Sequence, residues 1–190
     1  YLFIDALNPE QRARDLPCDK AFWHALQQEL LPQVYAIHPF SHLPQRTLVA
    51  GQSFGGLAAL YAALRWPERY GLVLSQSGSF WWPDADETCA NGWLTQQIAG
   101  GLGAETTLNI LLEVGCYEAD MIGVNRATCA VLTAAGHQVH DREYLGGHVW
   151  ICWREGLLSG PTPLIKTTAG NHHLKTPINR KHQHESRKLT

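Results

Sequence analysis

The sequence lacks the features that mark membrane-spanning, secreted and metal-binding proteins. In 190 residues no apolar run approaches the roughly 20 residues that a transmembrane helix needs, and no basic segment leads into an apolar one at the start, as a signal peptide would require. The five cysteines are scattered and form no Cys-x-x-Cys pair. We therefore expect free thiols in a reducing cytoplasm, and neither a disulfide framework nor a cysteine metal site.

Charged side chains are also few, at 17% of the residues, and the two signs are unevenly distributed. Residues 1–158 contain nine Lys and Arg against sixteen Asp and Glu, which gives −7, whereas residues 159–190 contain six against one, which gives +5. We therefore predict one domain over residues 1–158 and a basic tail that is disordered or non-native and binds no nucleic acid. We expect no metal site from the scattered histidines of that tail, which are His172, His173, His182 and His184.

Within residues 1–158, short apolar runs alternate with segments whose apolar residues recur at helical spacing. Strands are predicted at residues 1–4, 47–50, 70–75, 108–115 and 138–144. Helices are predicted after Asp19, over residues 57–64 and 93–98, around 124–132, and over 150–158. This alternation indicates an α/β fold in which helices cover both faces of a mostly parallel sheet.

Two further expectations concern the N-terminal region. Residues 8–15, which include Arg12 and Arg14, are expected to form a polar loop at the C-terminal edge of the sheet, where open α/β sheets bind ligands. Pro32 is expected to kink or end the helix that follows, because proline has no backbone N–H to donate. Trp23 of the same helix is expected to lie in the core.

A Gly-x-Ser-x-Gly pattern is centred on Ser53 and joins an apolar run to a segment of small residues. This pattern describes a nucleophile elbow, in which a serine occupies a strained turn between a strand and a helix. Gly51 and Gly55 are interpreted as residues without a β-carbon that allow neighbouring chain to pass close by. The flanking residues 47–50 and 57–64 supply the strand and the helix, so Ser53 is the candidate nucleophile.

A serine hydroxyl is a poor nucleophile at neutral pH, so Ser53 needs a base within hydrogen-bonding reach. His148 is the candidate base, because it follows the last predicted strand in a Gly-Gly-His loop. The resulting order of serine, acid and histidine is typical of α/β-hydrolases. His137 and His140 are weaker candidates, since they lie at the start of that strand or within it.

The acid should follow the strand before the histidine, and both Glu118 and Asp120 do; the pattern alone does not separate them. An oxyanion hole needs backbone N–H donors, and the residue after the nucleophile, Phe54, supplies one. A second donor from an early loop is not evident in the sequence. Trp81 and Trp82 lie in a loop beyond a strand end, where they either cover the core or line the site.

Seven groups of residues taken together resemble the catalytic domain of the ferric enterobactin (enterochelin) esterases, in the esterase-D-like branch of the α/β-hydrolases. The resemblance covers roughly residues 1–158 and rests on the following segments: Arg12-x-x-Asp15-Leu16-Pro17-Cys18, Phe22-Trp23, Glu29-Leu30-Leu31-Pro32, Val49-Ala50-Gly51-Gln52-Ser53-Phe54-Gly55-Gly56, Trp66-Pro67-Glu68-Arg69, Leu74-Ser75-Gln76-Ser77-Gly78-Ser79 with Trp81-Trp82, and Gly146-Gly147-His148.

The resemblance implies a serine esterase that hydrolyses the trilactone of ferric enterobactin and so releases siderophore iron in the cytoplasm. It implies no cofactor, because iron belongs to the substrate, and no nucleic-acid or membrane partner. In the family the acid follows a Leu-Glu-x-Gly motif, which corresponds to Glu118 and not to Asp120. Arg12 resembles a residue that faces the ligand, and Arg14, Trp81 and Trp82 are expected to bind the anionic, catechol-bearing substrate with it.

The family also has an N-terminal accessory domain and an Asp-Gly loop upstream of the strand matched by Tyr1. The resemblance therefore predicts a chain truncated at its N-terminus and atypical at its C-terminus. Two alternatives remain open at this point. One is an inactive fragment of a hydrolase, and the other is a different serine esterase or acyltransferase of the same fold.

Overall fold

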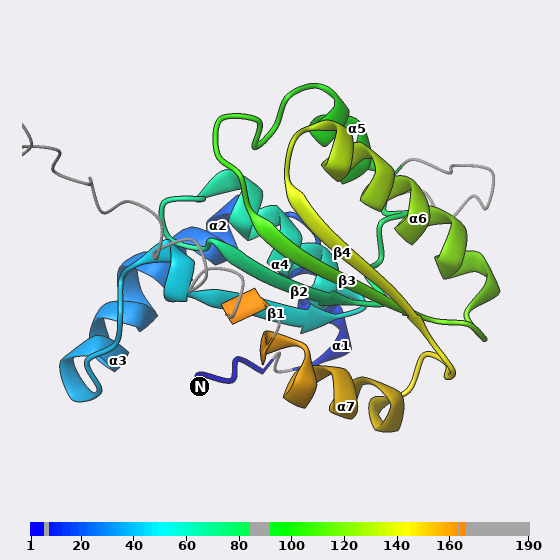
Figure 1. Ribbon diagram of the computed structural model, residues 1–190. Coiled ribbons are helices and arrows are strands. Elements are labelled where there is room, and N and C mark those ends of the chain that lie inside the picture. Colours follow the sequence, from blue (N-terminus) through cyan, green and yellow to red (C-terminus); the bar gives the residue numbers. More distant parts are fainter. Residues whose placement is uncertain (6–7, 84–91, 163, 166–190) are drawn as a thin grey trace, which may run out of the picture.

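A parallel sheet of four strands forms the centre of the computed structural model, which describes residues 1–5, 8–83, 92–162 and 164–165 (Figure 1). The strands lie in their order along the chain: β1 (Leu48–Gln52), β2 (Leu72–Gln76), β3 (Asn109–Gly115) and β4 (Gln138–Tyr144). β2 and β3 are buried along their whole length, as their continuous apolar runs favour. The prediction of a mostly parallel sheet is confirmed.

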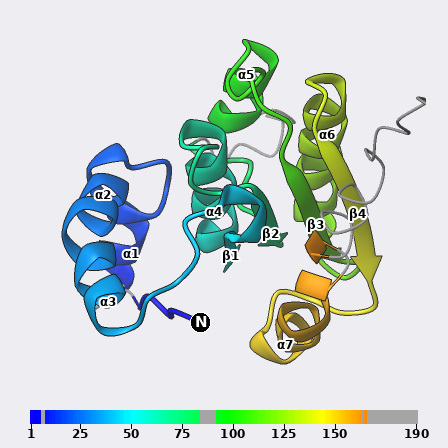
Figure 2. The ribbon, with the colours of Figure 1, turned by 60° about the vertical axis from the view of Figure 1, so that its left-hand side comes forward.

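Helices cover both faces of this sheet, as predicted. The chain passes through α4 (Phe54–Arg65), α5 (Trp93–Ala99) and α6 (Ala119–Ala134) between successive strands. Each helix connects one strand to its neighbour in the sheet, always in the same direction, and right-handed connections of this kind place all three helices on one face. α7 (Trp150–Ser159) lies on the opposite face of the sheet (Figures 1 and 2). Among the described helices, none is long and apolar enough to cross a bilayer.

The core lies between the sheet and α4, whose residues from Gly56 to Leu64 are all buried. Small residues dominate this helix, so its backbone approaches the sheet closely. Leu57 and Leu60 pack there against Val73 and Ile110 in one apolar cluster. Burying a side chain of this size contributes about 1.5–3 kcal/mol, so this cluster is a main source of the stability of the fold.

The N-terminal region is helical where a polar loop was predicted, and that prediction is wrong. α1 (Pro9–Asp15) begins at Asn8, whose side chain accepts a hydrogen bond from the backbone N–H of Gln11 at 2.8 Å. Proline at the first helical position and arginines in the last turn are ordinary helix signals, and here they outweigh the polar composition.

The helix that follows changes its hydrogen-bond pattern just before Pro32, where a kink or an end was predicted. α2 (Lys20–Ala25) begins at Asp19 as predicted, and a π-turn (Leu26–Leu30) connects it to α3 (Leu31–Ile37). The π-turn opens the regular hydrogen-bond ladder just before the proline, which then occupies the first turn of α3 and costs no bond. Trp23 is buried and joins the core, which confirms that prediction.

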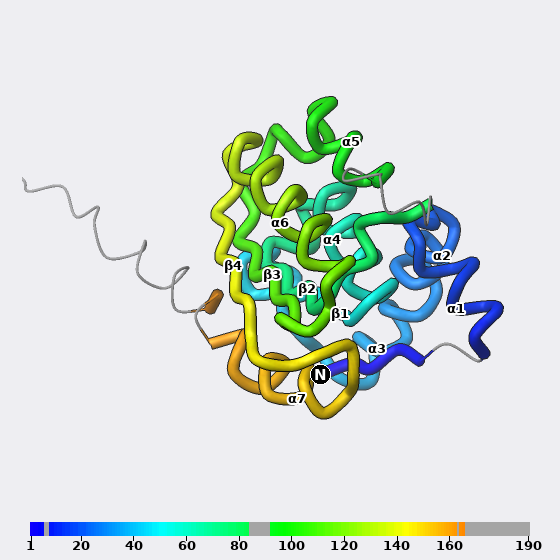
Figure 3. The backbone as a smooth tube through the Cα atoms, turned by 90° about the vertical axis from the view of Figure 1, so that its right-hand side faces the viewer, coloured from blue at the N-terminus to red at the C-terminus, as the bar shows by residue number. Residues whose placement is uncertain are grey.

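The strand predicted at residues 1–4 is absent, and this prediction is also wrong. Tyr1 and Phe3 are 111% and 80% exposed, and residues 1–5 run on the side of the sheet where α7 lies (Figure 3). A strand exists only through hydrogen bonds to a neighbour. Apolar composition alone does not provide them, and within the described part of the chain the outer edge of β1 is unpaired.

Packing against the sheet extends beyond α7. The backbone is helical again at residues 161–162 and 164–165, and Leu164 is buried against Leu74 and Leu111. The side-chain amide of Asn109 donates to the carbonyl of Leu164 at 3.1 Å. The basic tail from residue 166 onward, with its histidines, lies outside the described residues.

Candidate active site

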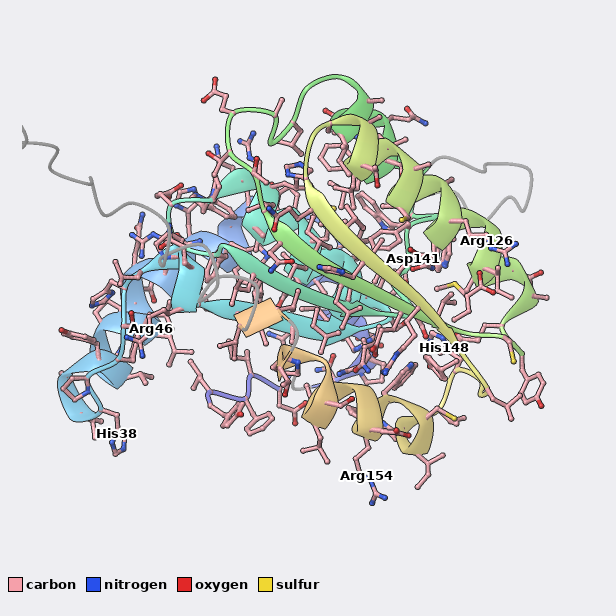
Figure 4. The ribbon with its side chains drawn as sticks, viewed as in Figure 1. His38, Arg46, Arg126, Asp141, His148 and Arg154 are labelled. Carbon is pink, nitrogen blue, oxygen red and sulfur yellow. The ribbon has the colours of Figure 1, made fainter. Side chains whose placement is uncertain are left out.

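The C-terminal ends of the parallel strands converge at one edge of the sheet and bring the candidate residues together. Each candidate follows a different strand. His148 lies at this edge, between the end of β4 and the start of α7 (Figure 4). The residues that the loops supply are Ser53 after β1, Ser77 and Ser79 after β2, Glu118 after β3, and His148 after β4.

Ser53 occupies a strained turn between β1 and α4. Its φ is 57° and its ψ is −121°, in the region that favours glycine. Its N–H donates to the carbonyl of Gln76 at 2.9 Å, which ties the turn to β2. A β-carbon on Gly51 would lie 2.2 Å from the carbonyl oxygen of Gly55, so only glycine fits at position 51. The elbow geometry predicted from the sequence is therefore present.

The second close approach involves a glycine that the sequence pattern did not single out. A β-carbon on Gly55 would meet no atom within 4 Å, so this residue is not needed for space. A β-carbon on Gly56 would lie 2.6 Å from the hydroxyl of Ser75 on β2. The close contact of α4 with the sheet therefore depends on Gly56.

Phe54 stands where an oxyanion donor is expected. It is the first residue of α4, and the first N–H groups of a helix have no partner within the helix. Its N–H is thus available beside Ser53. The second donor, expected from an early loop, stays a prediction.

Glu118 and His148, the candidate acid and base, are hydrogen-bonded to each other. Glu118 is buried directly before α6, and the Nδ1 of His148 lies 2.6 Å from its Oε2. Because an ionised carboxylate only accepts hydrogen bonds, Nδ1 carries the proton and Nε2 is left free to act as a base. Asp120, the alternative acid, is exposed in the first turn of α6.

The hydroxyl of Ser53 lies 3.3 Å from the hydroxyl of Ser79. Among the described residues, no hydrogen bond joins Ser53 to His148, whose side chain is 42% exposed. Catalytic hydrogen bonds are often long in a ligand-free enzyme and shorten when the substrate binds. Ser79 is therefore the partner of the nucleophile in the resting site.

A row of polar side chains crosses the sheet below the site, on the face covered by α7. One residue comes from each strand in register: Gln52, Gln76, Glu113 and Arg142. Gln52 donates to Gln76 at 3.0 Å, Gln76 donates to Glu113 at 2.8 Å, and Arg142 forms an ion pair with Glu113. Gln76 also donates to the carbonyl of Trp153 at 2.9 Å. The row thereby fixes α7 on the sheet.

Of the predicted substrate-binding residues, Arg12 and Trp81 lie beside the elbow. The guanidinium of Arg12 donates to the carbonyl of Gln52 at 3.4 Å and lies 5.5 Å from the centre of the Phe54 ring. The ring of Trp81 lies 5.7 Å from the same ring on centroids. These residues form a cationic and aromatic surface next to Ser53.

Arg14 and Trp82 have other contacts. Arg14 is 69% exposed and forms an ion pair with Asp15 at 2.7 Å. Trp82 packs edge-on against Trp93, with ring centroids 6.2 Å apart, at the border of the core. Both tryptophans are partly buried against the core, and Trp81 in addition contacts Phe54 beside Ser53.

The described cysteines are free thiols. Burial raises the pKa of the Cys18 thiol to about 12, which makes this thiol unreactive. Burial also raises the pKa of Cys129. Because the thiolate is the reactive form, neither competes with Ser53 as a nucleophile. In the described part of the chain, no cluster of three or more His, Cys, Asp or Glu is arranged to hold a metal ion.

Three residues of the site were not found from the sequence: Ser77, Ser79 and Trp153. Both serines belong to the run of small polar residues that follows a buried strand. Because that strand is the next one after the nucleophile strand, this position was the sequence feature that could have indicated a role in the site. Trp153 lies in a predicted helix and carries no sequence signal of its own.

A parallel sheet with a strained serine after one strand and a paired glutamate and histidine after two others defines a serine hydrolase of the α/β-hydrolase type. The chain belongs to the esterase family, whose model, described as "Putative esterase", matches residues 5–161.

Similar proteins agree with this family. The chain is 52% identical over 168 residues to the iron(III) enterobactin esterase of Dickeya dadantii (strain 3937), a match that covers 84% of this chain and 39% of that protein. Identity to the iron(III) enterobactin esterase of Escherichia coli (strain K12) is 50% over 160 residues, covering 84% and 40%. The chain therefore spans about two fifths of the length of the curated relatives it matches.

Solved structures show the same relationship. The enterochelin esterase from Shigella flexneri superimposes with a TM-score of 0.82 at 46% identity, covering 87% of this chain and 42% of that one. An S-formylglutathione hydrolase from Staphylococcus aureus shares the fold alone, with a TM-score of 0.58 at 17% identity. The resemblance to enterobactin esterases that the sequence motifs indicated is confirmed.

Proposed function

We propose that this chain is the catalytic part of an esterase that hydrolyses the trilactone of iron-loaded enterobactin. The observation that carries the proposal is the buried Glu118–His148 pair at the same sheet edge as the strained Ser53, in a chain 52% identical to an iron(III) enterobactin esterase. The geometry supports the mechanism, and the similarity supports the substrate. The reaction uses no cofactor, since iron is part of the substrate. We place it in the cytoplasm, in keeping with the free thiols.

The reaction follows the roles of the three side chains. Ser53 Oγ attacks a lactone carbonyl carbon while Nε2 of His148 takes its proton, and the carboxylate of Glu118 accepts a hydrogen bond from Nδ1–H and stabilises the imidazolium. The oxyanion is stabilised by the N–H of Phe54. The ester bond then breaks, and the leaving seryl alkoxide takes the proton from His148. Water, deprotonated by His148, releases the acyl group from Ser53 in the same way.

The first step requires a change of hydrogen-bond partner. In the resting site the hydroxyl of Ser53 is close to Ser79, so it must rotate towards His148 before its proton can transfer. The rotation concerns one side-chain torsion, because the backbone of the elbow is already fixed. Substrate bound against the elbow covers the site, and this favours rotation of the Ser53 hydroxyl from Ser79 towards His148.

The charge of the substrate requires local cations. A ferric tris-catecholate is an anion, whereas residues 1–158 carry a formal charge of −7. Arg12 provides positive charge directly beside Phe54, and Trp81 adds an aromatic face on which a catechol ring can stack. We therefore assign the substrate surface to Arg12 and Trp81, whereas the positive charge of Arg14 is balanced by its ion pair with Asp15.

The test compares two substrates in the wild type and in Ser53→Ala. We expect the wild type to cleave both ferric enterobactin, followed by separation of its linear products, and a simple aryl ester. Ser53→Ala should lower kcat on both by at least about 10⁴-fold. Cleavage of the aryl ester alone would reject the siderophore and favour another esterase. Activity that survives the substitution would reject the mechanism, and no activity in a folded wild type would identify an inactive fragment.

A further inference from the structure

Ser77 adopts a backbone conformation that a serine adopts only at a cost. Its φ is 49°, in the left-handed region where glycine is unstrained, and it is buried completely. Glycine would satisfy this backbone, but it would remove the two hydrogen bonds of the hydroxyl. The presence of serine at such a position indicates that the hydroxyl has a function of its own.

The hydroxyl of Ser77 holds the carboxylate of Glu118. It donates to Oε1 of Glu118 at 2.7 Å, and the N–H of Gly115 donates to the same oxygen at 2.9 Å. One donor comes from the end of β2 and the other from the end of β3. With Oε1 fixed from two strands, Oε2 is directed at Nδ1 of His148.

Trp153 determines the direction in which the Ser77 proton points. Its indole Nε1–H, which can only donate, lies 3.0 Å from the hydroxyl oxygen of Ser77. Ser77 therefore accepts from Trp153, and its own proton is left for Glu118. The ring of Trp153 also packs edge-on against His148, with centroids 4.7 Å apart. One residue of α7 thus contacts His148 directly and acts on Glu118 through Ser77.

We infer that Ser77 is a positioning residue for the Glu118–His148 pair and that Trp153 orients its hydroxyl. The inference rests on the proposed function, because it assigns Ser77 a part in the same ester hydrolysis. The chain of hydrogen bonds runs from Trp153 through Ser77 to Glu118, which also accepts from His148. Its effect is to hold the carboxylate at the angle that keeps Nε2 of His148 facing the nucleophile.

The experiment uses Ser77→Gly, which removes the hydroxyl and relieves the backbone strain. We expect its Tm to stay within a few degrees of the wild type, while kcat on an aryl ester falls about 10-fold or more with KM unchanged. Labelling of Ser53 by an alkyl fluorophosphonate, in which Oγ displaces fluoride from phosphorus, should slow by a similar factor. The downfield proton resonance of the short His148–Glu118 hydrogen bond should shift upfield or broaden.

Two other variants sharpen the result. Trp153→Phe keeps the ring and loses the N–H, so it should lower kcat in the same direction by a smaller factor. Ser75→Ala is the matched control, because Ser75 is a buried serine on β2 whose hydroxyl has no hydrogen-bond partner among the described residues. Its kcat and its His148 resonance should equal those of the wild type.

Each outcome decides the inference. Wild-type kcat and an unchanged His148 resonance in Ser77→Gly would overturn it, and so would a loss of activity that follows only from a large fall in Tm. If the wild type cleaves no ester, the proposed function fails. The fluorophosphonate rate and the resonance still decide then whether Ser77 positions the pair.

Discussion

The two halves of the active site hold their reactive groups by different means. The nucleophile half, residues 48–65, places Ser53 through its backbone: a strained φ, a glycine against a carbonyl, and an N–H bound to the next strand. The acid–base half, residues 113–153, places Glu118 and His148 mainly through side-chain hydrogen bonds, to which the backbone N–H of Gly115 adds one donor. The partners that orient this half lie on three different elements, β2, β3 and α7.

This difference has a consequence for substitution. A residue whose position is fixed by close backbone contacts is displaced by an added β-carbon, but most changes to neighbouring side chains leave its position unchanged. A position held by side-chain hydrogen bonds keeps its fold when one bond is lost, but it loses its orientation. Added β-carbons in the nucleophile half should therefore reduce stability and activity together, whereas loss of a single side-chain hydrogen bond in the acid–base half should reduce activity with little effect on stability.

Within the acid–base half, the largest effect is expected for Glu118→Gln. Because Ser77 and the Gly115 N–H both donate to Oε1, they select the amide oxygen of the new glutamine for that position. The amide NH₂ then faces Nδ1 of His148 and forces the proton onto Nε2, the wrong tautomer for a base. We expect kcat to fall by about 10³–10⁴-fold, with Tm little changed, measured on an aryl ester and by thermal unfolding.

Asp120→Asn is the matched control for this prediction. Asp120 is an exposed carboxylate two residues away in the first turn of α6, and it was the alternative acid on sequence grounds. Its kcat should remain at the wild-type value. Equal losses of kcat in Glu118→Gln and Asp120→Asn would show that the contacts of Glu118 do not identify it as the catalytic acid.

In the nucleophile half we expect a combined loss from Gly51→Ala. The new β-carbon would lie 2.2 Å from the carbonyl oxygen of Gly55, so the backbone of the elbow must shift. Such overpacking costs about 1–3 kcal/mol, and a displacement of the nucleophile near 1 Å lowers kcat by roughly 10²-fold. Chemical unfolding and steady-state kinetics measure the two losses.

Gly55→Ala tests whether the elbow needs both glycines of the Gly-x-Ser-x-Gly pattern or only the one whose β-carbon would clash. Nothing lies within 4 Å of a β-carbon at this position, and alanine is a better helix former than glycine. We expect unchanged or slightly increased stability and activity near that of the wild type. A loss as large as that of Gly51→Ala would contradict the steric account of the elbow.

The same contrast explains how much could be predicted from the sequence. The nucleophile half is contiguous, so its strand, serine and helix were all predicted in place. The acid–base half is assembled by tertiary contacts, so His148 was found by its order in the chain, while Glu118 and Asp120 could not be separated from the residues alone. Ser77 and Trp153 act through contacts between positions 76 residues apart, which no local pattern reveals.

The errors in the fold have related causes. Residues 1–4 have strand composition, but pairing depends on a neighbour that composition does not provide. Residues 8–15 look like a loop by polarity, yet their helix is stabilised by the cap at Asn8. At Pro32 a kink or an end of the helix was predicted and is not contradicted; what periodicity does not predict is the π-turn that precedes the proline.

The smallest predicted loss concerns the substrate surface of the nucleophile half. The experiment compares Trp81→Ala with Trp82→Ala. Trp81 contacts Phe54 beside Ser53, whereas Trp82 contacts Trp93 at the border of the core. Losing one aromatic contact to a catechol ring costs about 0.5–1.5 kcal/mol, which corresponds to roughly a 2- to 10-fold weaker affinity for ferric enterobactin. We expect Trp81→Ala to show this loss in fluorescence titration. Both variants should lower Tm, because both tryptophans pack against the core, but Trp82→Ala should keep wild-type affinity. If affinity falls in Trp82→Ala and not in Trp81→Ala, the substrate does not lie against the elbow, and the nucleophile half holds the serine alone.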